Sequence, residues 1–324
     1  MTRLSNLQWV PRWVSQLGCL KSCCDYLQLG ISDGWLYGGT GYAFVLNMHE
    51  AACPSSLTAW RTEPLLALTA NLGIAVSGVA GSGRSVHEPP AEGLQRKAWD
   101  HARAAIDAGR PCYGWELRIP EYYLIDGYDE TGYYFTGPLC PDGDGPLPWQ
   151  ELGRTAIGVL ELYSVRPGDG LSDREIVRRG LALALEQSQH SGEWSPPQYE
   201  TGLAGYDRWI RAVEEGTALE IGLAYNAAAW GECRHFATQF LAEARQRLER
   251  GPFGAIAEAQ LHYRTVATHL AEVVRQMPFS PGLSSDPIGD DPRRGPVAAQ
   301  LRAAREAEAR GLHALAEIIA ALRP

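Results

Sequence analysis

Apolar residues recur every three or four positions through the second half of the chain, which is the spacing of helices that bury one face. This period predicts helices over residues 173–189, 202–215, 218–250, 254–277 and 297–322. It is interrupted near Gly251 and Pro252, and again between Pro278 and Pro296, because glycine and proline disfavour a continuous helix. We therefore expect a helical C-terminal domain, a kind of bundle that can scaffold, cap a site or form a homodimer.

The first half has shorter apolar runs of a different kind. Apolar, β-branched and aromatic residues predict strands over residues 74–79, 121–128, 133–136 and 156–165. The second and third of these flank a turn at 129–132, which indicates a hairpin. Helices are expected over residues 19–29, 65–72 and 94–108. This half is therefore predicted to be an α+β domain whose sheet is antiparallel.

The two patterns meet at a turn-rich segment, residues 166–170, of sequence Arg-Pro-Gly-Asp-Gly. Ser172 can cap the helix that follows, and Glu175 stands at the spacing of a capping box. Seven of the ten tryptophans and ten of the fourteen tyrosines precede residue 166, which agrees with two domains of different type. We divide the chain into an α+β domain at 1–167 and a helical domain at 168–324.

The charge of the chain limits its partners. Its 324 residues include 29 basic and 38 acidic side chains, a formal net charge of −9. Such a balance repels phosphate backbones, so nucleic acid is not expected as a partner. No apolar run approaches the roughly 18–20 residues of a membrane span, and the first residues lack the apolar segment of a signal peptide. We expect a cytoplasmic protein without a membrane partner.

The seven cysteines are an odd number without the spacing of a disulfide framework, so we expect reduced thiols. Cys19, Cys23 and Cys24 lack a second pair of cysteines or histidines at the spacing of a zinc site. Neither a metal ion nor another cofactor is therefore expected.

Residues 18–27 contain a cysteine that could be a nucleophile. Their sequence is Gly-Cys-Leu-Lys-Ser-Cys-Cys-Asp-Tyr-Leu. A helix that begins near Cys19 would place this thiol in the first turn, with Leu20, Cys24 and Leu27 as its buried stripe. Unpaired N–H groups at a helix start stabilise a thiolate and lower its pKa. The alternative is that the cysteines are small core residues, as free cysteine usually is.

Two blocks of the chain resemble a known family. The first contains Gly-Cys at 18–19, Leu-Gly-Ile-Ser at 29–32 and Leu-Tyr-Gly-Gly-Thr-Gly-Tyr-Ala-Phe at 36–44, and the second contains Gly-Arg-Pro at 109–111 with the aromatic segments 121–129 and 132–138. Over about residues 15–165 the chain is similar to the N-terminal domain of butirosin biosynthesis protein H. That family resembles papain-like cysteine peptidases, among them the double-glycine leader peptidases. The resemblance implies acyl transfer from a carrier protein to an amine, or peptide hydrolysis, on a small-molecule, peptide or acyl-carrier substrate.

The resemblance also implies a catalytic group at Cys19. Such chemistry needs a thiolate, an imidazole that exchanges a proton with it, and a group that orients the imidazole. Glu121 occupies the position of the peptidase histidine, and Gly137 occupies that of the orienting aspartate. Glutamate, with a reference pKa of about 4.3, accepts a proton weakly at neutral pH unless burial raises its pKa.

Three alternatives follow for this degenerate site. His49, just after the Gly-rich block, could supply the imidazole from a different element. A buried Glu121 with a raised pKa could itself act as the general acid and base. Otherwise the protein is a non-catalytic binding or scaffold protein that uses the same cleft.

The remaining candidates are donors and binding residues around this site. Gln16 and the backbone N–H of Gly18 are candidate oxyanion donors at the helix start. The candidate substrate-binding residues lie in the Gly-rich block and in the aromatic strands: Tyr37, Gly38, Trp115, Glu116 and Tyr122. Aromatic residues of strands more often simply pack, so ordinary core packing is the alternative for this group.

Overall fold

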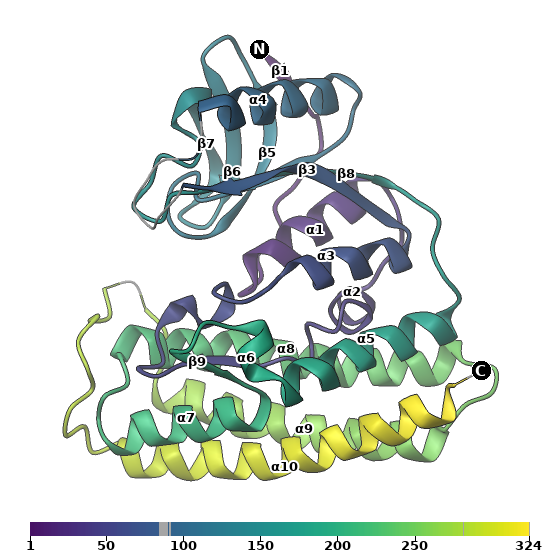
Figure 1. The fold of residues 1–324 in the computed structure, drawn as a ribbon, viewed down its shortest axis with the longest axis vertical. Coiled ribbons are helices and arrows are strands. Elements are labelled where there is room, and N and C mark those ends of the chain that lie inside the picture. The colour runs from purple at the N-terminus through teal and green to yellow at the C-terminus, as the bar shows by residue number, and fades with distance from the viewer. Residues whose placement is uncertain (84–89, 91, 281, 324) are drawn as a thin grey trace. The chain divides into compact units, whose positions relative to one another are not determined.

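The computed structural model describes residues 1–83, 90, 92–280 and 282–323, and its ribbon is drawn in Figure 1. The chain forms two compact units. The sheet unit contains Met1–Ile31 and Gly73–Gly170, and the helical unit contains Ser32–Leu72 and Leu171–Pro324. The predicted mixture of helices with an antiparallel sheet is confirmed. The expected boundary at 167/168 lies close to the point between Gly170 and Leu171 where the chain passes for the last time from the sheet unit to the helical unit. Residues 32–72, which we placed in the first domain, belong to the helical unit.

The sheet unit is organised around one antiparallel sheet. Its strands among the described residues are β1 (Thr2–Arg3), β3 (Ile74–Ser82), β4 (Cys112–Trp115), β5 (Tyr122–Tyr128), β6 (Gly132–Gly137), β7 (Cys140–Pro148) and β8 (Val159–Pro167). Their order is β3-β8-β4-β5-β6-β7, with β1 paired to β5. The four predicted strands correspond to β3, β5, β6 and β8. The sequence pattern missed β7, because its prolines and glycines are depleted in strands, and β4, which has only four residues.

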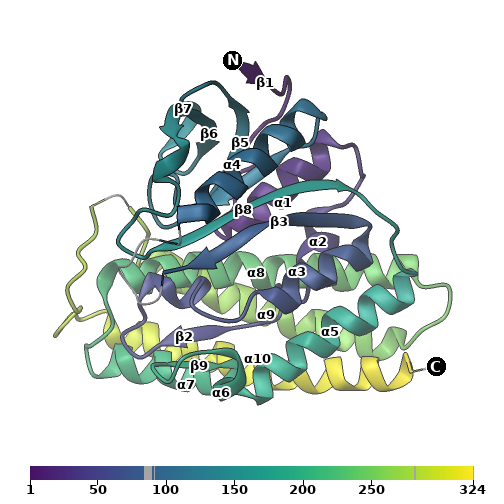
Figure 2. The ribbon, with the colours of Figure 1, turned by 45° about the horizontal axis from the view of Figure 1, so that its top comes forward.

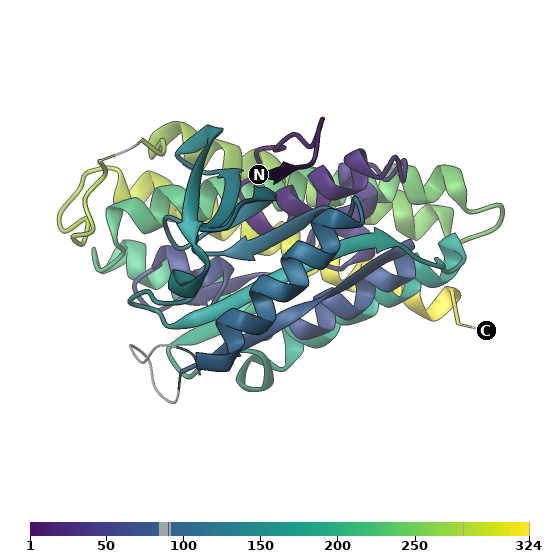
Figure 3. The same cartoon turned by 90° about the horizontal axis from the view of Figure 1, so that it is seen from above.

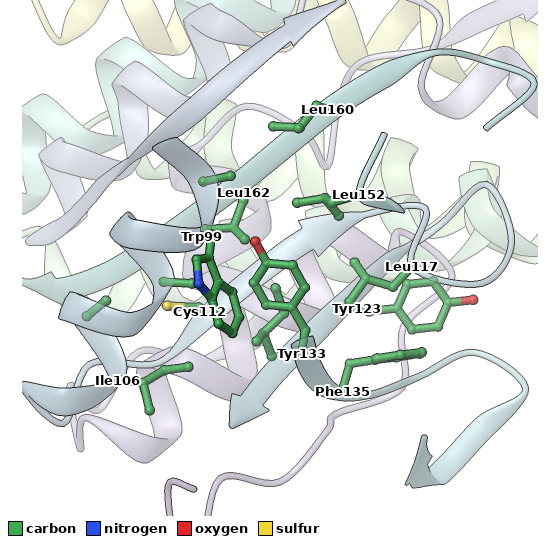
Figure 4. Packing of buried hydrophobic residues seen from close by; sticks show 14 of the residues in the cluster. Trp99, Ile106, Cys112, Leu117, Tyr123, Tyr133, Phe135, Leu152, Leu160 and Leu162 are labelled. Carbon is green, nitrogen blue, oxygen red and sulfur yellow. The ribbon is translucent and has the colours of Figure 1, made fainter. Parts of the chain in front are cut away.

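Helices cover both faces of this sheet (Figure 1). α4 (Glu92–Asp107) crosses one face, as Figure 3 shows, and α1 (Ser15–Tyr26) packs against β4 and β5. A short 3-10 helix, η3 (Trp149–Glu151), joins β7 to β8. Neighbouring residues of a strand point to opposite faces, so Tyr123 enters the core beside α4 while Tyr122 points to the other face. Figure 4 shows that core, where the ring centroid of Trp99 lies 5.1 Å from that of Tyr133.

The helical unit consists of long helices with one small two-stranded sheet. α8 (Glu220–Arg247), α9 (Phe253–Gln276) and α10 (Arg294–Ala321) lie side by side in Figure 2. With α5 (Asp173–Gln189) and α7 (Gly202–Glu214), they confirm the five predicted helices of the second half. The smaller elements are α2 (Asp33–Gly39), β2 (Asn47–His49), η1 (Pro54–Leu57), α3 (Glu63–Thr69), η2 (Ala70–Leu72), α6 (Ser191–Trp194) and β9 (Tyr199–Thr201), and β2 pairs with β9.

A buried ion pair attaches the early segment 32–72 to these long helices. Arg234 of α8 is fully buried and donates to both carboxylate oxygens of Glu308 on α10, at 2.8 and 3.1 Å. Its Nη1 atom donates to the backbone oxygens of Ala43, at 3.2 Å, and Val45, at 2.7 Å. A buried guanidinium is costly unless it is fully paired. This requirement explains why the segment folds with helices that follow it by almost two hundred residues.

Gly38 of α2 lies against the ring of Phe240 on α8, where an added Cβ would come within 2.0 Å of a ring carbon. We expect Gly38→Ala to lower the free energy of unfolding by about 1–3 kcal/mol, the usual cost of overfilling a packed interior. Gly254→Ala is the matched control, because a Cβ there meets open space, and it should change this free energy by less than about 1 kcal/mol. Urea unfolding followed by circular dichroism measures both, and a Gly38→Ala protein as stable as the wild type would contradict this packing.

Candidate functional site

Cys19 lies inside a helix and not at its start. α1 begins at Ser15, so Cys19 stands in the second turn, and its side chain is fully buried. Burial raises the pKa of the Cys19 thiol well above its ordinary value, and the negative charge of Glu121 raises it further. Burial likewise raises the pKa of Cys24 to about 12. The first-turn position and the lowered pKa that we expected for Cys19 are therefore corrected, since this thiol is a protonated core group at neutral pH.

Ser15 occupies the helix start in place of Cys19. Its hydroxyl donates to the Oε2 atom of Glu121, the residue just before β5, and its Oγ atom accepts the backbone N–H of Tyr122 at 3.0 Å. Ser15 is 4% exposed, so these bonds lie in the interior. Ser15 is not among the candidates expected from the sequence, because the predicted helix begins one turn later, at Cys19. Serine near a helix N-terminus, shortly after Pro11, was the signal that could have found it.

The two expected oxyanion donors differ in whether their N–H groups already have a hydrogen-bond acceptor. The side chain of Gln16 is 4% exposed, and its Nε2 atom has no hydrogen-bond acceptor among the described residues. The N–H of Gly18, in contrast, donates to the backbone oxygen of Val14 at 3.0 Å within the helix, so it is not available to a ligand. Gly18 has a packing role, because an added Cβ would come within 2.8 Å of the backbone oxygen of Val10. Gln16 alone of this pair remains a candidate donor.

Three of the expected binding residues lie on or beside β4 and β5 of the sheet unit, and one of them, Tyr122, contacts Ser15. Trp115 and Tyr122 are cross-strand neighbours on β4 and β5, with ring centroids 5.0 Å apart, and the Tyr122 hydroxyl donates to the Glu161 carboxylate. Glu116 follows in the left-handed region, at φ 56°, and its N–H donates to the backbone oxygen of Glu121 at 2.8 Å. Its carboxylate accepts the Thr155 hydroxyl at 2.6 Å, yet burial raises the pKa of Glu116 above its ordinary value.

Tyr37 and Gly38, which we expected to bind substrate, lie in the helical unit. Tyr37 is fully buried and donates its hydroxyl to Glu232 of α8 at 3.2 Å, while Gly38 packs on Phe240. Both residues therefore contribute to the packing of α2 against α8. They lie there because residues 32–72 fold with the helical unit, whereas the glycine-rich block was expected in the first domain.

His49 also belongs to the helical unit, at the end of β2. Its Nδ1 atom accepts the N–H of Ala51 at 3.0 Å, which leaves the ring proton of the neutral imidazole on Nε2. The ring centroid lies 5.0 Å from that of Tyr199 on β9, and burial lowers the pKa of His49. His49 is thus a neutral imidazole at pH 7, in a different unit from Cys19 and Glu121.

The described part of the sheet unit contains one histidine, His101 of α4, whose Nε2 atom lies 2.9 Å from the Ser164 hydroxyl on β8. Nowhere in residues 1–83, 90, 92–280 and 282–323 do three or more histidine, cysteine or acidic side chains gather as they would around a metal ion. Over the same residues, every helix is too short or too polar to cross a membrane.

Comparisons of the sequence with protein-family models and with curated proteins find no match. The resemblance described above is accordingly carried by short motifs alone.

The burial of the cysteines predicts the order in which they react. Cys53 is half-buried, whereas the other six thiols are buried. Iodoacetamide applied to the native protein should therefore alkylate Cys53 first and leave Cys19 unmodified up to about pH 8, since only an accessible thiolate reacts. Peptide mass spectrometry reads each site, and protein unfolded in guanidinium, where all seven should react, is the control. Alkylation of Cys19 as fast as Cys53 at neutral pH would contradict its burial.

The raised pKa of Glu116 predicts a pH-dependent stability. A carboxyl whose pKa is higher in the folded protein stabilises the fold below its unfolded pKa of 4.5. This contribution is lost as pH rises through the folded pKa. The free energy of unfolding of wild type minus that of Glu116→Gln should therefore decrease from about pH 4 to pH 7. Urea unfolding at several pH values measures the difference.

Glu175 provides a comparison of opposite sign. Arg178 and Arg179 hold the pKa of Glu175 at about 2, so its stabilising contribution is present above the unfolded pKa and is lost as pH falls. The wild-type minus Glu175→Gln difference should fall toward low pH. If the wild-type minus Glu116→Gln difference in the free energy of unfolding also fell toward low pH, the pKa of Glu116 would not be raised by burial.

Proposed function

We propose that the sheet unit is a papain-like domain and that the protein acts on the carbonyl group of an acyl, amide or thioester substrate where α1 meets β5. The observation that carries this proposal is the hydrogen bond from the Ser15 hydroxyl to the Glu121 carboxylate. Acyl-transfer sites require a nucleophile within hydrogen-bond reach of a proton acceptor. This bond supplies such a pair at the first turn of a helix, where the positive end of the helix dipole favours developing negative charge.

Neighbouring groups support the same chemistry. Gln16, the next residue of α1, has a buried amide donor without an acceptor among the described residues, which a carbonyl oxygen could satisfy. Trp115 and Tyr122 are buried and pack against each other on the adjoining strands, so the surroundings of the pair are apolar on that side. Transfer of the acyl group to an amine and hydrolysis differ only in the acceptor, and both belong to the proposal.

Non-catalytic binding at the same site is the second candidate. It is favoured by the complete burial of Cys19, which leaves the thiol expected from the family resemblance protonated. In that case the pairing of Ser15 with Glu121 holds α1 to β5, and the Gln16 amide recognises a carbonyl without reaction. The dimer expected through the helical unit stays a prediction under either candidate.

The proposal predicts turnover of simple acyl compounds. We expect wild-type protein to cleave p-nitrophenyl acetate and an N-acetylcysteamine thioester, and to form a hydroxamate when hydroxylamine is the amine acceptor. Glu121→Gln should lower the rate by about 10²–10⁴-fold, the usual contribution of a general acid–base group. Absorbance at the nitrophenolate band and a thiol reagent measure the two reactions.

Glu130→Gln, which changes an exposed glutamate in the turn between β5 and β6, is the matched control and should retain the wild-type rate. Wild-type turnover no higher than that of heat-denatured protein would reject catalysis. If the thioester then still raised the melting temperature, the second candidate, binding without reaction, would be the better description.

A further inference from the structure

We propose that the attacking atom of this site is the hydroxyl oxygen of Ser15, with Glu121 as its base. This inference rests on the function proposed above and names the residues that perform it. It differs from the expectation from the sequence, in which the Cys19 thiol attacks. Both side chains are buried, but Cys19 lies one turn further along α1 as a protonated thiol, whereas Ser15 stands at the helix start with its proton already directed to a carboxylate.

The hydrogen bonds of Ser15 arrange its oxygen for attack. The hydroxyl donates to Glu121 Oε2, so the proton points to the group that must accept it. The same oxygen accepts the N–H of Tyr122 at 3.0 Å, and this donor stabilises negative charge as it develops on Oγ. The helix adds to this effect, because its 12 residues have their positive end at Ser15 and its first turn contains no acidic residue.

Gln16 is an independent indication that a ligand group belongs at the start of α1. Its side chain is more than nine-tenths buried, and the Nε2 donor has no acceptor among residues 1–83, 90, 92–280 and 282–323. Buried donors in folded proteins almost always have an acceptor, supplied by protein, water or ligand. A neutral carbonyl oxygen fits this donor better than an anion does, because the Glu121 carboxylate lies beside Ser15, the preceding residue.

The reaction follows from these positions. Ser15 Oγ forms a bond to the substrate carbonyl carbon while its proton moves to Glu121, and the carbonyl electron pair moves to the oxygen, which Gln16 then hydrogen bonds. The carbonyl re-forms as the bond to the leaving thiol, amine or alcohol breaks, and Glu121 returns the proton to that group. Water or an amine then attacks the carbonyl carbon of the Ser15 ester and gives its proton to Glu121. The bond from this carbon to Ser15 Oγ breaks as Glu121 passes the proton to that oxygen, which releases the acyl product and restores both the serine and the carboxylate.

The test uses a biotinylated fluorophosphonate, whose phosphorus forms a bond to an activated serine oxygen as fluoride leaves. We expect wild-type protein to be labelled at Ser15, as located by tandem mass spectrometry, and Ser15→Ala to be unlabelled. Glu121→Gln should be labelled about 10²-fold more slowly or less, because the proton acceptor is lost. Ser22→Ala is the matched control, since Ser22 lies on the same helix and its hydroxyl bonds the backbone of Val10 and Gly18, and it should be labelled at the wild-type rate.

Two results would overturn the inference in ways that can be told apart. If p-nitrophenyl acetate turnover survives in Ser15→Ala but is lost in Cys19→Ala, the thiol is the nucleophile, and the proposed carbonyl chemistry stands while this inference fails. If wild-type protein neither turns over the acyl compounds nor takes the label, the proposed function fails and the inference fails with it.

Ser15→Ala removes a bond between α1 and β5, so its folding must be checked by circular dichroism. Ser15→Cys keeps a donor and acceptor at this position and provides a second test. In this variant we expect iodoacetamide to alkylate residue 15 while Cys19 stays unmodified, and we expect the fluorophosphonate label to be lost. If residue 15 of this variant is as unreactive as Cys19, reagents do not reach the helix start and the inference is wrong.

Discussion

The hydroxyl of Ser15 fixes the first helix of the sheet unit to the strand that carries its aromatic residues. It is bonded to the Glu121 carboxylate and to the Tyr122 N–H, both at the start of β5. Breaking hydrogen bonds in such a buried arrangement is more costly than the loss of a single exposed bond. The contact therefore determines which residue of α1 faces the carboxylate, and it leaves Cys19 one turn deeper in the core.

The sequence predicted much of the architecture, because the periodic burial of apolar residues is a local property. The five long helices and the hairpin of β5 and β6 were found in this way. The place of residues 32–72 in the helical unit was not predicted. It depends on Arg234, which lies far along the chain and donates hydrogen bonds to Glu308 and to the backbone of Ala43 and Val45. A buried arginine inside an otherwise apolar helix pattern is a weak signal, and its partners cannot be read from spacing.

The candidate site residues divide between the two units for a similar reason. Glu121, Trp115, Glu116, Tyr122 and Gln16 lie in the sheet unit, and their roles stay predictions. Ser15 was missed because a helix repeats every 3.6 residues, so that residues four apart share a face. An apolar pattern that fits a helix starting at Cys19 fits one starting at Ser15 equally well. Only the tertiary contact with Glu121 distinguishes the two helix starts. It shows that the residue paired with the carboxylate is the Ser15 hydroxyl, while Cys19 is a buried, protonated thiol.

If Ser15 and Glu121 together form the reacting pair of the sheet unit, an acyl-enzyme should form on the serine. This intermediate can be trapped by mixing the protein with p-nitrophenyl acetate at mildly acidic pH, quenching with acid and locating the acetyl group by tandem mass spectrometry. We expect an acetyl ester on Ser15 that accumulates faster than acetylation of any lysine or of Cys53. Acetyl groups found only on Cys53 and lysines, with Ser15 unmodified, would contradict it.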